Sequence, residues 1–125
     1  MTSPAPTTGN SWVATGLEVL RTADFQGGRL SRAGTYAVCF AAEWCPITRR
    51  FMPRFVPLKG TLPATFAIAD ITDLNDSLWD DFQIRITPSI IVFRDGQVLG
   101  RIDGRRFLGI SANALASLGE LVAAR

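Results

Sequence analysis

Apolar and polar residues follow one another in short blocks along most of the chain. Three blocks are apolar, rich in β-branched and aromatic residues, and short enough for buried strands: 35–40, 66–71 and 90–93. A fourth block, residues 17–20, alternates well enough for a short strand. Asp95-Gly96 is typical of a tight hairpin turn, so residues 97–102 are predicted to return antiparallel to the block before it.

Between these strands, apolar residues recur at spacings that suit helices. Three such segments are predicted: 49–56, 72–82 and 111–122. Pro53 lies inside the first helix and is expected to kink or break it. Thr72 or Asp73 is expected to open the second helix, and Ser111 to cap the last one. Residues 22–25 suggest the start of a further brief helix.

The predicted order of elements is β-α-β-α-β-α-β-β-α. Strand–helix–strand crossovers produce parallel strands, and the late hairpin adds an antiparallel pair. We therefore expect an α/β fold, with a central mixed β-sheet flanked by helices on both faces. The Pro-, Ser- and Thr-rich residues 1–10 are expected to form a flexible tail. Residues 11–125 are expected to form one domain, because a chain of this length supports a single core.

Composition narrows the classes of function. The chain has 13 basic and 11 acidic residues and no basic run, so no nucleic-acid partner is expected. No apolar stretch approaches the length of a membrane span, so no membrane partner is expected either. With no histidine and two cysteines, neither a metal site, a Cys–His dyad nor a cofactor is expected. The N-terminus lacks the pattern of a signal peptide, and a cytoplasmic, reducing compartment is the default expectation.

The residues with the most distinctive chemistry lie where the strand at 35–40 runs into the first long helix. Pro46 suits the first helical position, because its missing N–H would be unpaired there, and this places Cys45 at the helix N-terminus. Free backbone N–H groups and the helix dipole favour a thiolate there, which is the nucleophilic form. Thr48 can bring a hydroxyl beside the sulfur. We expect the sulfur at the surface end of the helix, with a pKa roughly one to two below about 8.5.

This stretch resembles the active site of the thioredoxin family, whose motif reads roughly F-x-A-E-W-C-G-P-C-K. Glu43, Trp44 and Cys45 match the motif, and Pro53 stands at the spacing of a later family proline. The resemblance implies a thiol–disulfide oxidoreductase that acts on protein or low-molecular-weight thiol and disulfide substrates.

A second segment, residues 84–96, resembles the region around the family's cis-proline. Two independent motifs in the right order imply the thioredoxin fold over roughly residues 15–124. By this resemblance, Pro88 stands at the cis-proline, and Thr87 would offer its main-chain N–H and C=O to a substrate strand. The substrate-binding residues implied are Trp44, Pro46, Thr87, Pro88 and Gly104.

The chain departs from the family pattern at three positions that serve one chemical step. The second cysteine of the motif is Thr48, the aspartate six residues before the first cysteine is Cys39, and a nearby lysine is Ala69. All three would help to release a mixed disulfide by internal attack. Cys39 is interpreted as a small apolar residue on a buried strand. The alternative is a displaced resolving thiol, which needs Cα atoms within about 7 Å.

Two functions from different classes remain open. The first is a monothiol oxidoreductase in which Cys45 forms mixed disulfides that an external thiol resolves, with Cys45 and Thr48 as catalytic residues. The alternative is a redox-inactive module that holds peptides in the groove between Trp44 and Pro88. Four arginines near these motifs are expected to be solvated surface charges: Arg49, Arg50, Arg85 and Arg105.

Overall fold

The structure of the protein is a computed structural model that describes residues 10–124. Residues 1–9 of the predicted tail therefore lie outside the described residues, and helix α1 (Asn10–Val13) begins the described chain. Each helix between residues 10 and 124 is too short or too polar to cross a membrane.

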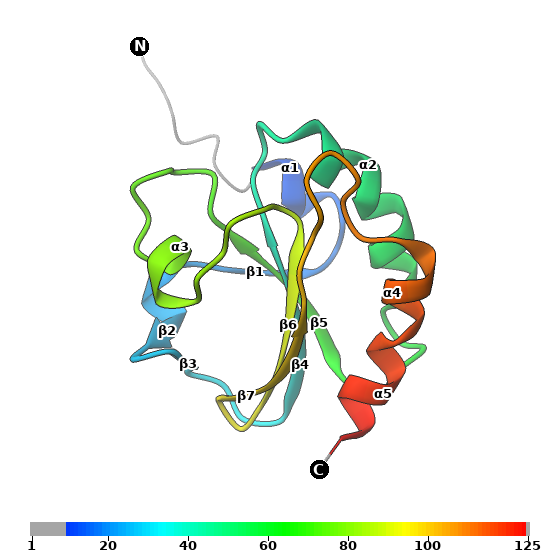
Figure 1. Cartoon of the computed structure of the whole chain (residues 1–125). Helices are drawn as coiled ribbons and strands as arrows, with labels where there is room; N and C mark the ends of the chain where they lie inside the picture. Colours follow the sequence, from blue (N-terminus) through cyan, green and yellow to red (C-terminus); the bar gives the residue numbers. More distant parts are fainter. Residues whose placement is uncertain (1–9, 125) are drawn as a thin grey trace.

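A five-stranded sheet in the order β1-β5-β4-β6-β7 forms the centre of the molecule (Figure 1). Its strands are β1 (Glu18–Leu20), β4 (Thr35–Ala41), β5 (Thr65–Asp70), β6 (Ser89–Arg94) and β7 (Gln97–Ile102). β1 and β4 both run parallel to β5, whereas β6 pairs antiparallel with β4 and with β7. The predicted mixed sheet is thus confirmed. The structure adds a small hairpin that was not predicted, between β2 (Phe25–Gln26) and β3 (Arg29–Leu30).

Two apolar layers cover the two faces of the sheet, as the apolar character of its central strands requires. Alternate residues of β4 enter different layers, so that Cys39 faces one and Phe40 the other. The first layer includes α2 (Pro46–Phe55) and α5 (Leu118–Ala123), and the second includes α3 (Leu78–Asp81) and the β2–β3 hairpin (Figure 1). The elements on both sides hold β4 rigidly, and β4 leads directly into the candidate site.

The expected break at Pro53 is wrong, because α2 runs unbroken from Pro46 to Phe55 and continues as a 3₁₀ turn, η3 (Val56–Leu58). Proline removes the backbone bond to the residue four positions earlier, here Arg49. Pro53 and Arg49 are both exposed, so water can satisfy that carbonyl. Buried side chains on the opposite side of the helix, including Phe51 and Phe55, pack on the sheet and stabilise the helix across the proline.

The helix predicted over residues 72–82 is reduced to the four residues of α3. Short polar side chains hold the preceding backbone in turns instead. Thr72 donates its N–H to Asp70, Asn75 donates to Asp73, and Leu78 donates to Asp76. Such side chains compete with helical hydrogen bonds, which explains the shorter helix.

The brief helix suggested at residues 22–25 is present as a short turn, whereas the last predicted helix is divided. Residues 22–24 form a single 3₁₀ turn, η2 (Thr22–Asp24). The last helix is divided at Ser117 into α4 (Ala112–Ala116) and α5. The predicted cap is confirmed, because Ser111 Oγ accepts a hydrogen bond from the Ala114 N–H at 3.1 Å.

Candidate functional site

Cys45 is the N-cap residue of α2, and Pro46 occupies the first turn of that helix. The backbone N–H of Cys45 donates to the Ala42 carbonyl oxygen at 3.1 Å, which closes the turn between β4 and α2. The sequence predicted this placement from the strand that runs into a helical pattern at Cys45 and from Pro46 at the first helical position. Free amide groups of the first helical turn therefore lie beside the sulfur.

The thiol lies at the predicted end of the helix and reaches a groove, but it is more covered than a surface position suggests, because Cys45 is only 8% exposed. Segments distant in sequence cover it. The Thr87 carbonyl accepts a hydrogen bond from the Cys45 thiol, with 3.6 Å between Sγ and O. Cys45 lies in the wall of a groove of about 350 Å³ that Trp44, Ile47 and Thr87 also line. A substrate must enter this groove to reach the thiol.

Opposing influences set the pKa of Cys45. Burial raises the pKa, as expected for an acid whose charged form loses hydration. The hydroxyl of Thr48, the side chain of Thr87 and the backbone N–H groups of Thr48 and Ile47 all lower it. The balance leaves the pKa below its ordinary value, in the direction that the sequence predicted.

Thr48 lies directly under this thiol and is fully buried. Within residues 10–124 its hydroxyl meets no partner with regular hydrogen-bond geometry. Leaving a buried hydroxyl unsatisfied costs about 1–3 kcal/mol. The same hydroxyl can rotate and donate to Cys45 once the sulfur carries charge, so the site holds a donor available to a thiolate.

The structure brings together only part of the predicted substrate-binding set. Trp44 and Thr87 line the groove with Cys45, and the peptide bond between Thr87 and Pro88 is cis. Pro88 is buried behind Thr87. Gly104 packs against Pro88 so closely that an added Cβ would overlap the Pro88 carbonyl oxygen. Pro46 is exposed at the start of α2, outside the groove lining.

Several groove residues were missed at the sequence level. The indole rings of Trp44 and Trp79 stack with centroids 6.3 Å apart and planes 11° apart. The remaining lining residues that were missed are Ile47, Leu74, Arg85, Ile86, Arg106 and Phe107. Most of them come from segments far apart in sequence, so no local spacing links them, although Arg85 and Ile86 directly precede Thr87. The only available signal was their type, since bulky apolar residues and arginines in turns are candidates for contact surfaces.

A buried carboxylate supports the segment that carries Trp44. Asp70 accepts hydrogen bonds from the Thr72 N–H at 3.0 Å and the Thr72 hydroxyl at 2.5 Å, and it forms an ion pair with Arg21 at 2.9 Å. Thr72 in turn accepts from the backbone N–H of Glu43 and from the indole N–H of Trp44. The end of β5 therefore fixes the residues immediately before Cys45.

Cys39 is completely buried in the α2 layer of the core, and both cysteines are free thiols. Burial raises the pKa of Cys39 far above its ordinary value, so this thiol stays protonated and unreactive in the folded chain. Its setting is that of a small apolar core residue. Among the described residues, no group of three or more acidic or cysteine side chains is arranged to hold a metal ion.

A thiol at a helix N-terminus, facing the residue before a cis proline on a mixed sheet, defines the class of thioredoxin-fold proteins. The sequence model of the family described as Thioredoxin matches residues 17–116. The chain therefore belongs to the thioredoxin family, which is a family of thiol–disulfide oxidoreductases.

Curated relatives agree with this assignment. The chain is 33% identical over 91 residues to protein disulfide-isomerase A3 of Gallus gallus, a match that covers 70% of this chain and 17% of that protein. It is 32% identical over 77 residues to a thioredoxin of Rhodospirillum rubrum, covering 61% of this chain and 74% of that one. The chain spans under half of the length of the first two relatives, 17% of the isomerase and 47% of a thioredoxin H-type of Populus jackii.

Solved structures share the fold. Thioredoxin F from spinach chloroplast, in its long form, superposes with a TM-score of 0.68 at 15% identity, covering 94% of this chain and 95% of that one. The thioredoxin of Fasciola hepatica gives a TM-score of 0.65 at 21% identity, covering 85% of this chain and 99% of that one. At such identities these likenesses concern the fold alone.

Proposed function

We propose that this protein is a monothiol thiol–disulfide oxidoreductase in which Cys45 forms a mixed disulfide and an external thiol resolves it. One observation carries the proposal. The groove holds one thiol, Cys45, with Thr48 in the place of a resolving cysteine, and Cys39 is sealed in the core. A hydroxyl cannot form a disulfide, so release must come from outside the chain.

The chemistry is two exchanges at sulfur. In the first, the Cys45 thiolate attacks a substrate disulfide, one S–S bond forms, another breaks, and the released substrate thiolate takes a proton from water. In the second, a low-molecular-weight thiol displaces Cys45 as a thiolate and takes the substrate sulfur into a new disulfide. A further molecule of that thiol reduces the new disulfide. The two external thiols supply both electrons and become a disulfide.

The surrounding residues have separate roles in this proposal. Thr48 stabilises the Cys45 thiolate by donating its hydroxyl to charged sulfur. Thr87 presents its backbone to an extended substrate, and Trp44 forms the near side of the groove. Pro46, outside the groove lining, starts the helix that carries the thiol. Pro88 and Gly104 hold Thr87 in place from behind. Substrates are protein disulfides or protein thiols capped by a small thiol, and a reducing, cytoplasmic setting would supply the external thiol.

Insulin reduction tests the proposal. The wild type should give little turnover with thioredoxin reductase as the only electron source, but measurable turnover when a low-molecular-weight thiol is added. Thr48→Cys should gain reductase-coupled activity, limited by the missing acid at position 39, and Cys45→Ser should lose both activities. Strong wild-type turnover without added thiol would exclude a monothiol mechanism.

A redox-inactive binding module is the second candidate function. Its supporting observation is that the buried Cys45 thiol donates to the Thr87 carbonyl, an interaction that favours the protonated form. The pKa of Cys45 separates the two candidates. A value at or above about 8.5 would favour the binding module, whereas a lower value supports catalysis.

A further inference from the structure

Large apolar side chains stand exposed around Cys45. Trp44 is 51% exposed, Leu74 is 69% exposed and Phe107 is 79% exposed, and all three line the same groove. They come from the turn before α2, the turns after β5 and the loop after β7. Clustered exposed apolar side chains on one groove indicate an interaction surface rather than ordinary surface scatter.

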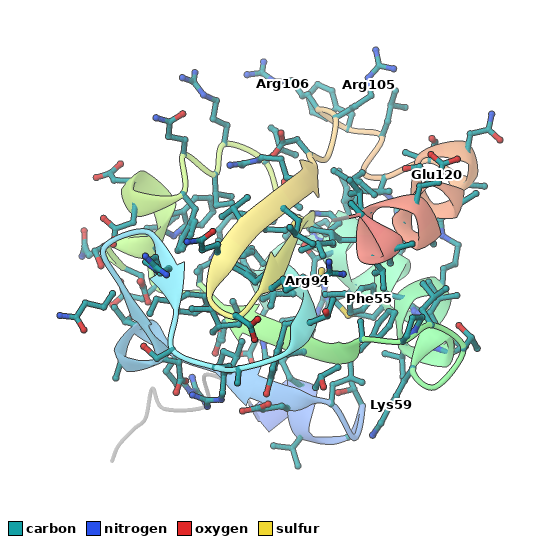
Figure 2. All side chains as sticks on the ribbon, turned by 90° about the horizontal axis from the view of Figure 1, so that it is seen from below. Phe55, Lys59, Arg94, Arg105, Arg106 and Glu120 are labelled. Carbon is teal, nitrogen blue, oxygen red and sulfur yellow. The ribbon has the colours of Figure 1, made fainter. Side chains whose placement is uncertain are left out.

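Arginines without partners border this groove. Arg85 and Arg106 line it. Within the described part of the chain, the side chains of Arg85, Arg105 and Arg106 form no ion pair and no hydrogen bond. Figure 2 shows Arg105 and Arg106 projecting away from the body of the molecule. The lining contains no acidic residue. In contrast, Arg32 is held by carboxylates elsewhere on the surface, and Arg101 is held by Asp103 in a neighbouring pocket that shares Arg85 and Ile86 with the groove.

Residues 105–108, named here the arginine tip, are ordered by their own backbone. Arg105 and Gly109 exchange hydrogen bonds of 2.9 and 2.8 Å, and the Leu108 N–H also donates to Arg105. Phe107 adopts a left-handed conformation, with φ of 66°, which is strained for a non-glycine residue. Despite this strain, the tip holds an aromatic ring and two arginines outward beside the thiol.

We infer that the groove and the arginine tip bind an extended, acidic segment of a client protein, a conclusion that rests on the proposed function and names its substrate class. An apolar side chain beside the client's sulfur would lie against Trp44 and Phe107, and flanking carboxylates would meet Arg85 and Arg106. Charge complementarity of this kind speeds encounter and selects partners. A small thiol would leave the outer apolar wall at Leu74 uncovered, which favours a peptide.

Two short peptides test this inference. They are identical except for Asp or Lys on both sides of one cysteine, which is capped with 2-thiopyridine so that attack by Cys45 releases a coloured product. Each rate is divided by the rate with a 2-mercaptoethanol–thiopyridine disulfide, which is small and uncharged. At low salt the acidic peptide should react about tenfold faster than the basic one, since steering raises association rates by tenfold or more. At 1 M salt, where the Debye length is about 3 Å, the difference should nearly vanish.

Charge reversal assigns the effect to residues. Arg85→Glu with Arg106→Glu should abolish or invert the preference, and each single reversal should weaken it. Arg29→Glu on the distant β3, matched in charge to either single reversal, should keep the preference. Equal wild-type rates for the two peptides, or a preference untouched by the double variant, would overturn the inference. A small acidic probe, the thiopyridine disulfide of 3-mercaptopropionic acid, supplies a further check. The inference would also be overturned if this probe reacted faster than the neutral 2-mercaptoethanol probe by the same factor that separates the two peptides.

Binding without chemistry separates this inference from the proposed function. Cys45→Ser, titrated with thiol-free versions of the two peptides and followed by tryptophan fluorescence, should bind the acidic peptide more tightly. If no probe reacts at Cys45 but this difference holds, the proposed oxidoreductase fails and the client surface stands. If the probes react and neither rates nor affinities discriminate, only the client surface fails.

Discussion

At the scale of single residues, Cys45 and Thr48 form one unit. Burial works against a thiolate, and hydrogen-bond donors around the sulfur outweigh it. The unsatisfied hydroxyl of Thr48 is unfavourable in the thiol state and becomes favourable in the thiolate state. In the proposed mechanism this difference contributes to the lowered pKa of Cys45, together with the Thr87 side chain and the backbone N–H groups of Ile47 and Thr48.

Thr48→Val tests this pairing. The variant should raise the pKa of Cys45, because it removes the hydroxyl that can donate a hydrogen bond to charged sulfur. Alkylation at neutral pH should slow in proportion. Stability should hold or rise, since the change removes an unsatisfied buried hydroxyl. Thiolate absorbance against pH, with Cys45→Ser as the blank, measures the shift. Identical titrations of wild type and variant would remove Thr48 from the mechanism.

At the scale of elements, the site depends on loops that meet from distant parts of the chain. Pro88, before β6, and Gly104, after β7, lie in contact behind the thiol, and Asp70 at the end of β5 fixes the segment that carries Trp44. The ends of neighbouring strands therefore position the groove. A change that moves one strand end should alter reactivity at Cys45 without touching the sulfur.

Gly104→Ala should reveal this dependence. The new methyl group would overlap the Pro88 carbonyl oxygen and crowd Ile86, so the backbone beside Cys45 must shift. We expect a loss of about 1–3 kcal/mol in the free energy of unfolding, typical of overpacking, together with slower reaction at Cys45. Gly119→Ala is the control, because its methyl group would meet Leu62 at an ordinary 3.6 Å. Denaturant unfolding of both variants should separate them, and equal stability would contradict this packing.

Local signals in the sequence predicted those features that depend on neighbours along the chain. Pro46 marked the start of α2, Asp95-Gly96 marked the β6–β7 turn, and Ser111 marked a cap. Features decided by distant contacts were not predictable in the same way. The burial of Cys45 depends on Thr87, and the continuity of α2 through Pro53 depends on packing against the sheet.

At the scale of the whole molecule, the two thiols lie in different environments. Cys39 belongs to the core, and Cys45 belongs to a groove that opens to solvent. Their pKa values move in opposite directions for that reason. The core that stabilises the fold thus also removes one thiol from the chemistry.

This division predicts a pH dependence of stability. The folded chain keeps Cys39 protonated, while the unfolded chain ionises it near about pH 8.5, so the unfolded state loses a proton that the native state retains. The free energy of unfolding should fall as pH rises above that value, approaching about 1.4 kcal/mol per pH unit. Cys39→Ala in a Cys45→Ser background should flatten the slope between about pH 8.5 and 10, before tyrosine ionises. An unchanged slope in urea titrations would contradict the prediction.

The most direct test of a monothiol mechanism is the intact mass of the protein after reaction with a disulfide substrate. Without added thiol, the wild type should accumulate one substrate adduct per chain, located at Cys45 by peptide mapping, and the adduct should persist. Adding a low-molecular-weight thiol should remove it and restore the original mass. Cys45→Ser should form no adduct. Absence of the adduct in the wild type, its loss without added thiol, or a Cys39–Cys45 disulfide would contradict the mechanism.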